Sequence, residues 1–316
     1  MSLSVGVDVG GTKIAAGVVD EKGAIIARTR RDTPSKDAPA IVEAIVSVTR
    51  ELAAEHDVEI VGVGSAGFID AGRSRVMFAP NLAWRDLPLR DQVAAATGLP
   101  VVVENDANAA AWAEFRFGAA EDVNDMVLLT IGTGVGGAVV LDGAMYRGAN
   151  GIAGELGHLR IVPDGQYCGC GLRGCLEAYA SGSALVRNAR AAASGSAAFP
   201  GSPAMLLDMA GGRAEGITGP MVTEAAQKGD PLAVHLMAEL GGWLGAAMGS
   251  LVSVFDPAVF VIGGGVADAG PLLLDPAEDA MRRSITGGTH RPHATVRLAT
   301  LGNDAGIVGA ADLART

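Results

Sequence analysis

The sequence predicts an α/β protein built from two similar units, and three observations support this. Segments with strand-like and helix-like periodicity alternate along the chain. A glycine-rich turn between two strands occurs twice, at residues 10–13 and at 132–137, about 120 residues apart. The chain has 316 residues, of which 49% are hydrophobic. This length is enough for about two domains of roughly 150 residues each.

The first unit opens as a strand meander around the first glycine turn. Apolar residues at helical spacing (Ile41, Ile45, Val48 and Leu52) then predict the first helix. A short Val101–Val103 run is typical of a buried strand. The expected elements are, in order, strands at 3–9, 14–19 and 24–29, a helix at 37–55, a strand at 58–64, a helix at 91–96 and a strand at 101–103. A further helix is expected to run from residues 104–106 to about residue 115.

The second unit repeats the opening meander and then becomes mainly helical. Residues 194–220 are rich in Gly, Pro, Ser and Ala, and we expect a loop-rich insert there. The apolar stripe and glycines of 231–254 predict a long helix, packed in the core or at an interface between copies. The expected elements are strands at 126–131 and 138–141, the 231–254 helix, strands at 258–262 and 294–300, and a closing helix at 304–314.

Composition excludes several classes of protein. The net charge of −11 argues against nucleic acid as a partner, because phosphate binding requires a basic face. The N-terminus lacks the basic and apolar segments of a signal peptide. No uninterrupted apolar run reaches the roughly 18 residues that a membrane span requires. We therefore expect a soluble, cytoplasmic protein without a membrane partner.

All three cysteines lie within eight residues, at Cys168, Cys170 and Cys175, and His158 stands ten positions upstream. One nitrogen and three thiolates are a ligand set of the type that closes a tetrahedral structural zinc site. Small buried thiols are the alternative, although they would be scattered along the chain. A disulfide is a weaker alternative interpretation, because it would leave one of the three cysteines unpaired.

The first glycine turn follows an acidic residue at a strand end. Gly10 and Gly11 let a phosphate approach backbone N–H groups, Thr12 adds a hydroxyl and Lys13 a positive charge. Asp8 could hold a magnesium ion through water. A simple hairpin is the alternative reading of such a turn, but the acidic residue and the second turn favour phosphate binding.

The second turn, which contains Thr133 and Gly134, matches the dinucleotide-binding pattern G-x-G-x-x-G as a string. That motif requires a following helix, whereas the next residues are strand-like, which argues against a Rossmann dehydrogenase. A P-loop kinase is also excluded, since G-x-x-x-x-G-K-[ST] does not occur. A phosphate-binding hairpin fits better.

Several polar residues are candidates for a sugar site. Asn105 and Asp106 end a buried strand, where a carboxylate is well placed to accept a proton from a substrate hydroxyl; a helix N-cap is the alternative. Glu155, His158 and Glu177 surround the cysteine cluster, and solvated surface is the alternative for both glutamates. Together these groups would suit a polyhydroxylated ligand.

These motifs resemble the repressor/open-reading-frame/kinase (ROK) family of sugar kinases, in particular its bacterial glucokinases. The resemblance spans nearly the whole chain and is most specific over Cys168–Glu177. It implies an actin-like ATPase (ribonuclease H-like) fold, with two lobes of mixed sheets around a central cleft. The implied lobes are residues 1–108 with 301–316, and 109–300 with the zinc loop 158–177.

The resemblance also implies a role for each motif residue. Asp106 matches the catalytic base, and His158 with the three cysteines matches the zinc ligands. The first phosphate motif spans Asp8 to Lys13, and Thr133-Gly134 is the second. The adenosine segment corresponds to Gly263, Gly264 and Gly265. The implied sugar contacts are Gly67, Asn81, Asn105, Asp106, Glu155, His158 and Glu177.

The activity implied is phosphorylation of glucose at its 6-hydroxyl, with ATP and Mg²⁺, and with structural Zn²⁺. Another hexose (fructose, mannose, allose or an N-acylated hexosamine) and polyphosphate as donor are open alternatives. A sugar-responsive transcription repressor is the least favoured, since the first phosphate strand begins at residue 3 and the net charge is −11. A homodimer or homotetramer is expected.

Overall fold

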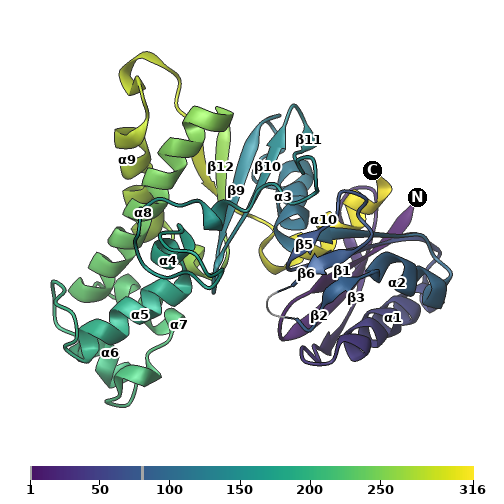
Figure 1. Ribbon diagram of the computed structural model, residues 1–316, viewed down its shortest axis with the longest axis horizontal. Helices are drawn as coiled ribbons and strands as arrows, with labels where there is room; N and C mark the ends of the chain where they lie inside the picture. Colours follow the sequence, from purple (N-terminus) through teal and green to yellow (C-terminus); the bar gives the residue numbers. More distant parts are fainter. Residues whose placement is uncertain (1, 80–81) are drawn as a thin grey trace. The chain divides into compact units, whose positions relative to one another are not determined.

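The computed structural model describes residues 2–79 and 82–316, which form two compact units (Figure 1). Unit 1 consists of the described residues of Met1–Met126, together with Ala138–Gly154 and Ala299–Thr316. Unit 2 consists of Val127–Gly137 and Glu155–Leu298. The chain therefore passes from unit 1 to unit 2 twice, and it returns to unit 1 each time, the second time for its last helix.

A five-stranded sheet forms the centre of unit 1. Its strands in spatial order are β3 (Ile25–Asp32), β2 (Lys13–Val19), β1 (Leu3–Val9), β4 (Val58–Ser65) and β8 (Val101–Asn105). β1 to β3 form the predicted antiparallel meander, whereas β4 runs parallel to β1 and β8 parallel to β4. Parallel strands end at the same edge, so Asp8 of β1 and Asn105 of β8 lie toward one edge of the sheet.

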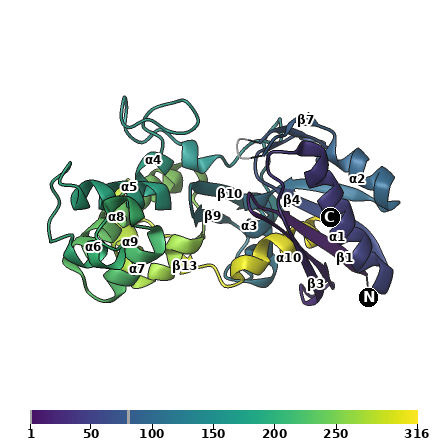
Figure 2. The same ribbon diagram turned by 90° about the horizontal axis from the view of Figure 1, so that it is seen from below.

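Helices cover both faces of this sheet. α1 (Ala38–Glu55) and α2 (Leu89–Thr97) lie on one face, and α10 (Ala305–Arg315) with α3 (Asp106–Phe117) lies on the other (Figures 1 and 2). Successive side chains of β2 point to opposite faces of the sheet. Ile14 packs against residues of α1, and its neighbour Ala15 packs against residues of α10. A Cβ atom at Gly6 would lie 1.9 Å from the Ile307 carbonyl oxygen. α10 therefore rests directly on the strand backbone.

A second, three-stranded sheet in unit 1 was not predicted. It consists of β5 (Phe68–Ile69), β6 (Val76–Phe78) and β7 (Arg85–Leu87), and its strands are antiparallel. Strands of two or three residues are too short to show an alternating pattern in the sequence. This small sheet follows β4 and contains the segment after Gly67.

The second large sheet repeats the strand order of the first. Its strands in spatial order are β11 (Ala144–Met145), β10 (Val135–Leu141), β9 (Met126–Ile131), β12 (Val259–Gly263) and β13 (Thr295–Leu298). In both sheets a meander is followed by two later strands, as expected for a duplicated unit. β10 begins at Val135 rather than at 138, because the turn is tighter than predicted. We call Gly132–Gly134 the second glycine turn.

Unit 2 contains β9, the start of β10, β12 and β13 of this sheet, whereas β11 and the rest of β10 belong to unit 1. Most of the other regular structure of unit 2 is helical. Its helices are α4 (Glu177–Ala180), α5 (Gly182–Ala193), α6 (Ala204–Met209), α7 (Gly219–Gln227), α8 (Pro231–Phe255) and α9 (Pro271–Ser284). Residues 194–220 are mostly loop, as expected, and they also contain the short helix α6, whose Leu206 is fully buried. α9 was not predicted, since Pro276 interrupts its pattern.

α8 is the predicted long helix, and its glycines contact α9. A Cβ atom at Gly241 would lie 2.7 Å from the Leu273 carbonyl oxygen, and one at Gly245 would lie 2.0 Å from that of Ala277. The glycine face therefore packs within unit 2. α8 is also the one helix in the described residues that is long and apolar enough to cross a membrane, but half of that stretch is buried, as in the core helix of a globular protein.

Candidate active site and metal centre

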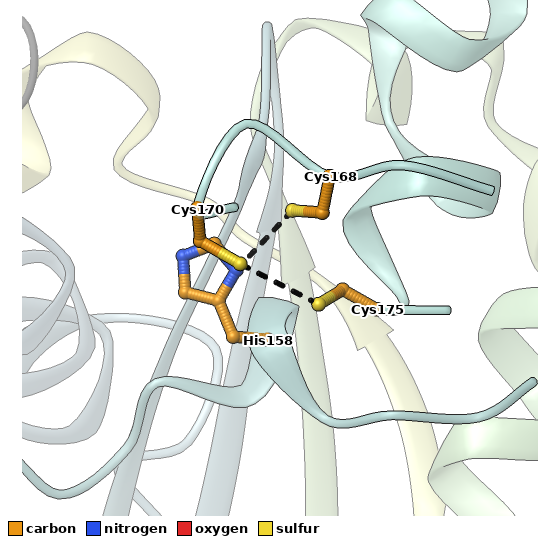
Figure 3. A group of neighbouring side chains, drawn as sticks. All are labelled: His158, Cys168, Cys170 and Cys175. Atoms are coloured by element: carbon orange, nitrogen blue, oxygen red, sulfur yellow. Dashed lines mark hydrogen bonds between the residues drawn. The ribbon is translucent and has the colours of Figure 1, made fainter. Parts of the chain in front are cut away.

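The four predicted zinc ligands come together in unit 2. His158 lies at the end of a 3₁₀ turn (Leu156–His158), and the three cysteines lie on the following loop (Figure 3). One ligand atom from each residue lies within 4.8 Å of the others. All three cysteines are free thiols. The sequence prediction of one convergent cluster therefore agrees with the structure, whereas a disulfide does not.

Two separations within the cluster match those around a tetrahedral zinc ion, and all the ligand atoms lie within 4.8 Å of one another. Zn–S bonds of about 2.3 Å and a Zn–N bond of about 2.0–2.1 Å require S···S distances of about 3.8 Å and S···N distances of about 3.6 Å. The Cys170 and Cys175 sulfurs are 3.7 Å apart, and the Cys168 sulfur is 3.6 Å from His158 Nδ1. Burial raises the pKa of the Cys168 thiol to about 12. A bound Zn²⁺ would reverse this, because it stabilises the thiolate.

In unit 1, Asp8 lies at the end of β1, and Asn105 and Asp106 lie where β8 ends and α3 begins. β4 separates the two strands, and all three residues lie toward the same edge of the sheet. Asn105 caps α3: its side-chain oxygen accepts hydrogen bonds from the backbone N–H groups of Ala107 (2.9 Å) and Asn108 (3.1 Å). Its side-chain amide donates to the Gly67 carbonyl oxygen (3.1 Å). Asp106 is the first residue of α3. The N-cap reading thus applies to Asn105, and the carboxylate of Asp106 is fixed at a helix start.

Both carboxylates have perturbed acidity. Burial raises the pKa of Asp106, although hydrogen bonds from backbone N–H groups oppose the rise. Burial and then the negative charge of Asp106 raise the pKa of Asp8 to about 6. A carboxylate with a raised pKa is a better proton acceptor near neutral pH. Two acidic groups with such shifts at one sheet edge are typical of a functional site rather than of a solvated surface.

The pKa of Asp8 leads to a stability prediction. Its folded-state value of about 6 exceeds the ordinary 3.8, so the folded state loses stability as the pH rises from about 4 through 6. We expect Asp8→Asn to stabilise the protein without ligands by about 1–3 kcal/mol at pH 8, with little effect at pH 4. Urea unfolding at the two pH values measures this difference. Equal stability of variant and wild type at pH 8 would contradict the shift.

Glu104 lies next to Asn105 and Asp106 in the sequence, but the sequence did not indicate which residues it contacts. Its side chain is 3% exposed and accepts hydrogen bonds from Arg147 Nε (2.7 Å), from Asn108 Nδ2 (2.9 Å) and from the Asn105 backbone N–H (3.0 Å). Arg73 adds a second cation at 3.4 Å. This buried ionic cluster holds the strand end that presents Asn105 and Asp106, and removing one partner would leave an uncompensated charge.

The first glycine turn is exposed at Gly11, Thr12 and Lys13. Gly10 N–H donates to the Lys13 carbonyl oxygen (3.0 Å), and the Thr33 hydroxyl donates to the Gly10 carbonyl oxygen (2.7 Å). The turn is thus a hairpin that is fixed at its base and open at its tip, and its phosphate-binding role stays a prediction.

A cavity of about 1000 Å³ lies within unit 2 and contains the second glycine turn. The predicted residues Thr133 and Gly265 line it, and Gly264 lies next to Gly265 with a φ of +85°. A Cβ atom at Gly264 would lie 2.5 Å from the Ile131 carbonyl oxygen, so only glycine fits there. Sequence reasoning missed the helical side of the cavity: Gly182, Ser183, Val186, Arg187, Arg190, Pro220, Thr223, Glu224, Gln227 and Asp268.

The other predicted site residues have separate positions. Glu155 precedes the 3₁₀ turn of His158 and is exposed. Glu177 begins α4, and its carboxylate accepts a hydrogen bond from the Val135 backbone N–H (3.1 Å). Gly67 has a φ of +113° and contacts the Phe78–Ala79 backbone. Asn81 lies outside the described residues.

Comparison with known proteins identifies the family. The ROK family model matches residues 4–316. The chain belongs to the ROK family. Among ROK proteins, a glucokinase from Streptomyces coelicolor is 49% identical over 315 residues, covering 100% of this chain and 98% of that protein. An N-acetylmannosamine kinase from Yersinia pseudotuberculosis is 34% identical, covering 100% and 99%.

The solved structures include a ROK family glucokinase from Streptomyces griseus in complex with glucose and AMPPNP. It is 52% identical, covers 99% of both chains and has a TM-score of 0.89. The predicted α/β fold class, with mixed sheets of the actin-like ATPase type, is therefore confirmed. The resemblance stated from the motifs alone is confirmed as well.

Proposed function

We propose that this ROK protein is an ATP-dependent glucokinase that phosphorylates the 6-hydroxyl of glucose. The observation that carries the proposal is the similarity, at 49% and 52% identity over essentially the whole chain, to two glucokinases, one of them solved with glucose and AMPPNP. The phosphate turns and the strand-end carboxylates described above supply groups that this reaction requires.

Asp106 is the proposed general base. Its carboxylate would accept the hydroxyl proton while the glucose oxygen forms a bond to the γ-phosphorus of ATP. The bond from that phosphorus to the bridging oxygen breaks, and ADP leaves. Mg²⁺ would neutralise phosphate charge when bound. Asp8, at the end of β1, is the residue of this chain proposed to hold it through water.

The remaining roles follow the motifs. We assign phosphate contacts to Gly10–Lys13 and to Thr133-Gly134, and adenosine contacts to Gly263–Gly265. The cavity of about 1000 Å³ beside Gly265 has room for a nucleoside, which favours ATP over polyphosphate. The proposed zinc is structural, since His158, Cys168, Cys170 and Cys175 leave no open coordination position. The proposed sugar contacts are Gly67, Asn81, Asn105, Asp106, Glu155, His158 and Glu177.

A hexose panel tests the proposal. Glucose, fructose, mannose and N-acetylmannosamine are supplied separately with ATP or polyphosphate, and ADP release is followed with coupling enzymes when ATP is the donor. We expect glucose with ATP to give the highest kcat/KM. A higher value for N-acetylmannosamine would replace the assigned sugar, in line with the 34% identical N-acetylmannosamine kinase. Turnover with polyphosphate but not ATP would replace the donor.

The sugar role of Glu155 has its own test. Glu155→Gln keeps the shape of the side chain but removes a charge-assisted hydrogen bond, worth about 1.5–3 kcal/mol. We therefore expect glucose affinity to fall at least about ten-fold, with affinity for AMPPNP unchanged. Calorimetric titration of each ligand measures both. A parallel loss of both affinities would argue against a sugar contact.

We also propose a cytoplasmic homo-oligomer, a dimer or a tetramer, because closed symmetric assemblies are the general rule for soluble oligomers. Light scattering should give two or four times the mass of one 31.8 kDa chain. A mass of one chain at the concentrations used for assay would refute the assembly.

A further inference from the structure

Glu177 has a position that a sugar contact alone does not explain. It stands two residues after the metal ligand Cys175 and begins α4. One carboxylate oxygen accepts a hydrogen bond from the Val135 backbone N–H at 3.1 Å. A Cβ atom on Gly134 would lie 2.2 Å from the same oxygen. The carboxylate therefore lies directly against the end of the second glycine turn.

The opposite oxygen of Glu177 faces the metal cluster. The Cys168 sulfur lies 3.5 Å from it. The Glu177 side chain thus bridges the metal loop and the second glycine turn. One carboxylate oxygen accepts from Val135 N–H and the other lies beside the Cys168 sulfur. Gly134 is the last residue of the second glycine turn, and Val135 is the first residue of β10 directly after it.

The residues on both sides of the metal loop hold the same turn. Gly157, one residue before the ligand His158, packs so closely that a Cβ atom would lie 2.1 Å from the Val135 carbonyl oxygen. After α4, Gly182 N–H donates to the Gly132 carbonyl oxygen (2.8 Å), and the Ser183 hydroxyl donates to that of Thr133 (2.7 Å). The turn is therefore fixed by segments that directly flank the metal ligands.

We propose that Glu177 is a positioning residue for the phosphoryl donor: it couples the metal loop to the second glycine turn and fixes the backbone that receives the nucleotide phosphates. The inference rests on the proposed function and extends it, because it gives the metal loop a part in nucleotide binding as well as in sugar binding. In this proposal, the length of the Glu177 side chain, which lets its carboxylate accept from the Val135 N–H, matters more for nucleotide binding than its charge.

Two substitutions separate reach from charge. Glu177→Gln keeps an oxygen at the same distance for the Val135 N–H and removes the charge. Glu177→Asp keeps the charge and withdraws the carboxylate by one methylene. We expect Glu177→Asp to weaken binding of Mg²⁺–AMPPNP about ten-fold or more, because the hydrogen bond to a charged group is lost. Glu177→Gln should weaken it by a smaller factor, because a neutral oxygen still accepts the hydrogen bond.

Calorimetry with Mg²⁺–AMPPNP gives the affinities, and hydrogen exchange of the 132–137 peptide gives a readout independent of activity. Exchange should be faster in Glu177→Asp than in wild type and near the wild-type rate in Glu177→Gln. Elemental analysis for zinc shows that the loop is intact in each protein. Glu215→Asp, which shortens an exposed carboxylate of the same unit away from the lining of the cavity, is the control and should leave AMPPNP affinity unchanged.

A stronger effect of Glu177→Gln than of Glu177→Asp on nucleotide binding would overturn the positioning role. So would unchanged AMPPNP affinity and unchanged exchange in Glu177→Asp. If wild type phosphorylates glucose while either result is obtained, this inference fails and the proposed function stands. If wild type neither binds AMPPNP nor phosphorylates a hexose, the proposed function itself fails.

Discussion

Asp106→Asn should leave a folded protein that binds glucose but turns over about two to four orders of magnitude more slowly, the range expected when a general base is lost. The amide keeps the shape of the side chain at the start of α3 but cannot accept the hydroxyl proton. Because burial raises the pKa of Asp106, the ionised carboxylate costs stability, and the variant should be no less stable than wild type above neutral pH.

Steady-state kinetics together with urea unfolding measure both effects. Asp91→Asn is a matched control, since Asp91 also lies in the first turn of a helix, α2, but is exposed and paired with Arg90. The control should keep wild-type turnover. Turnover close to wild type in a correctly folded Asp106→Asn protein would remove Asp106 from the role of base.

Removal of one cysteine of the metal cluster should have the second large effect. Protein purified without chelator should contain one zinc per chain, and Cys175→Ala should lose it, because a structural site requires all four ligands. If the loss costs about 3–5 kcal/mol, the Tm falls by roughly 10 °C for a unit of this size. Glucose affinity should fall with the metal, since the loop carries His158 and leads into Glu177.

Elemental analysis, calorimetry and thermal unfolding test this expectation. Leu172→Ala is the control, because Leu172 lies on the same loop but is 54% exposed. It should keep zinc and glucose binding. Wild-type protein that contains no zinc, or whose mass shows a disulfide in place of two thiols, would contradict the metal centre.

Local patterns predicted the parts of this protein that have strong local signals. The strand meanders, α1 and α8 have long apolar periodicities, and the cysteine cluster lies within one loop, so its ligands are close in sequence as well as in space. The strand-end position of Asp106 was also visible, because a short apolar run precedes it.

Contacts between distant segments could not be predicted in the same way. Glu104 is paired with Arg147, which lies 43 residues away, and nothing in either local sequence indicates the other. The Glu177–Val135 contact joins residues 42 positions apart. The helical side of the unit 2 cavity comes from α5 and α7, whose side chains lack a motif. α6 and the three-stranded sheet are short elements, and tertiary packing rather than local propensity determines them.

The packing of α10 has a consequence for how the chain is made. Gly6 and Gly62 lie in strands near the beginning of the sequence, and their missing side chains leave room for backbone of Ile307 and Ala310 near its end. During translation, the part of this face that α10 covers stays exposed until all of unit 2 has been synthesised, although α3 covers the rest earlier. Such exposed intermediates are prone to aggregation. Truncation before α10 should therefore impair solubility during expression more than loss of eleven surface residues would.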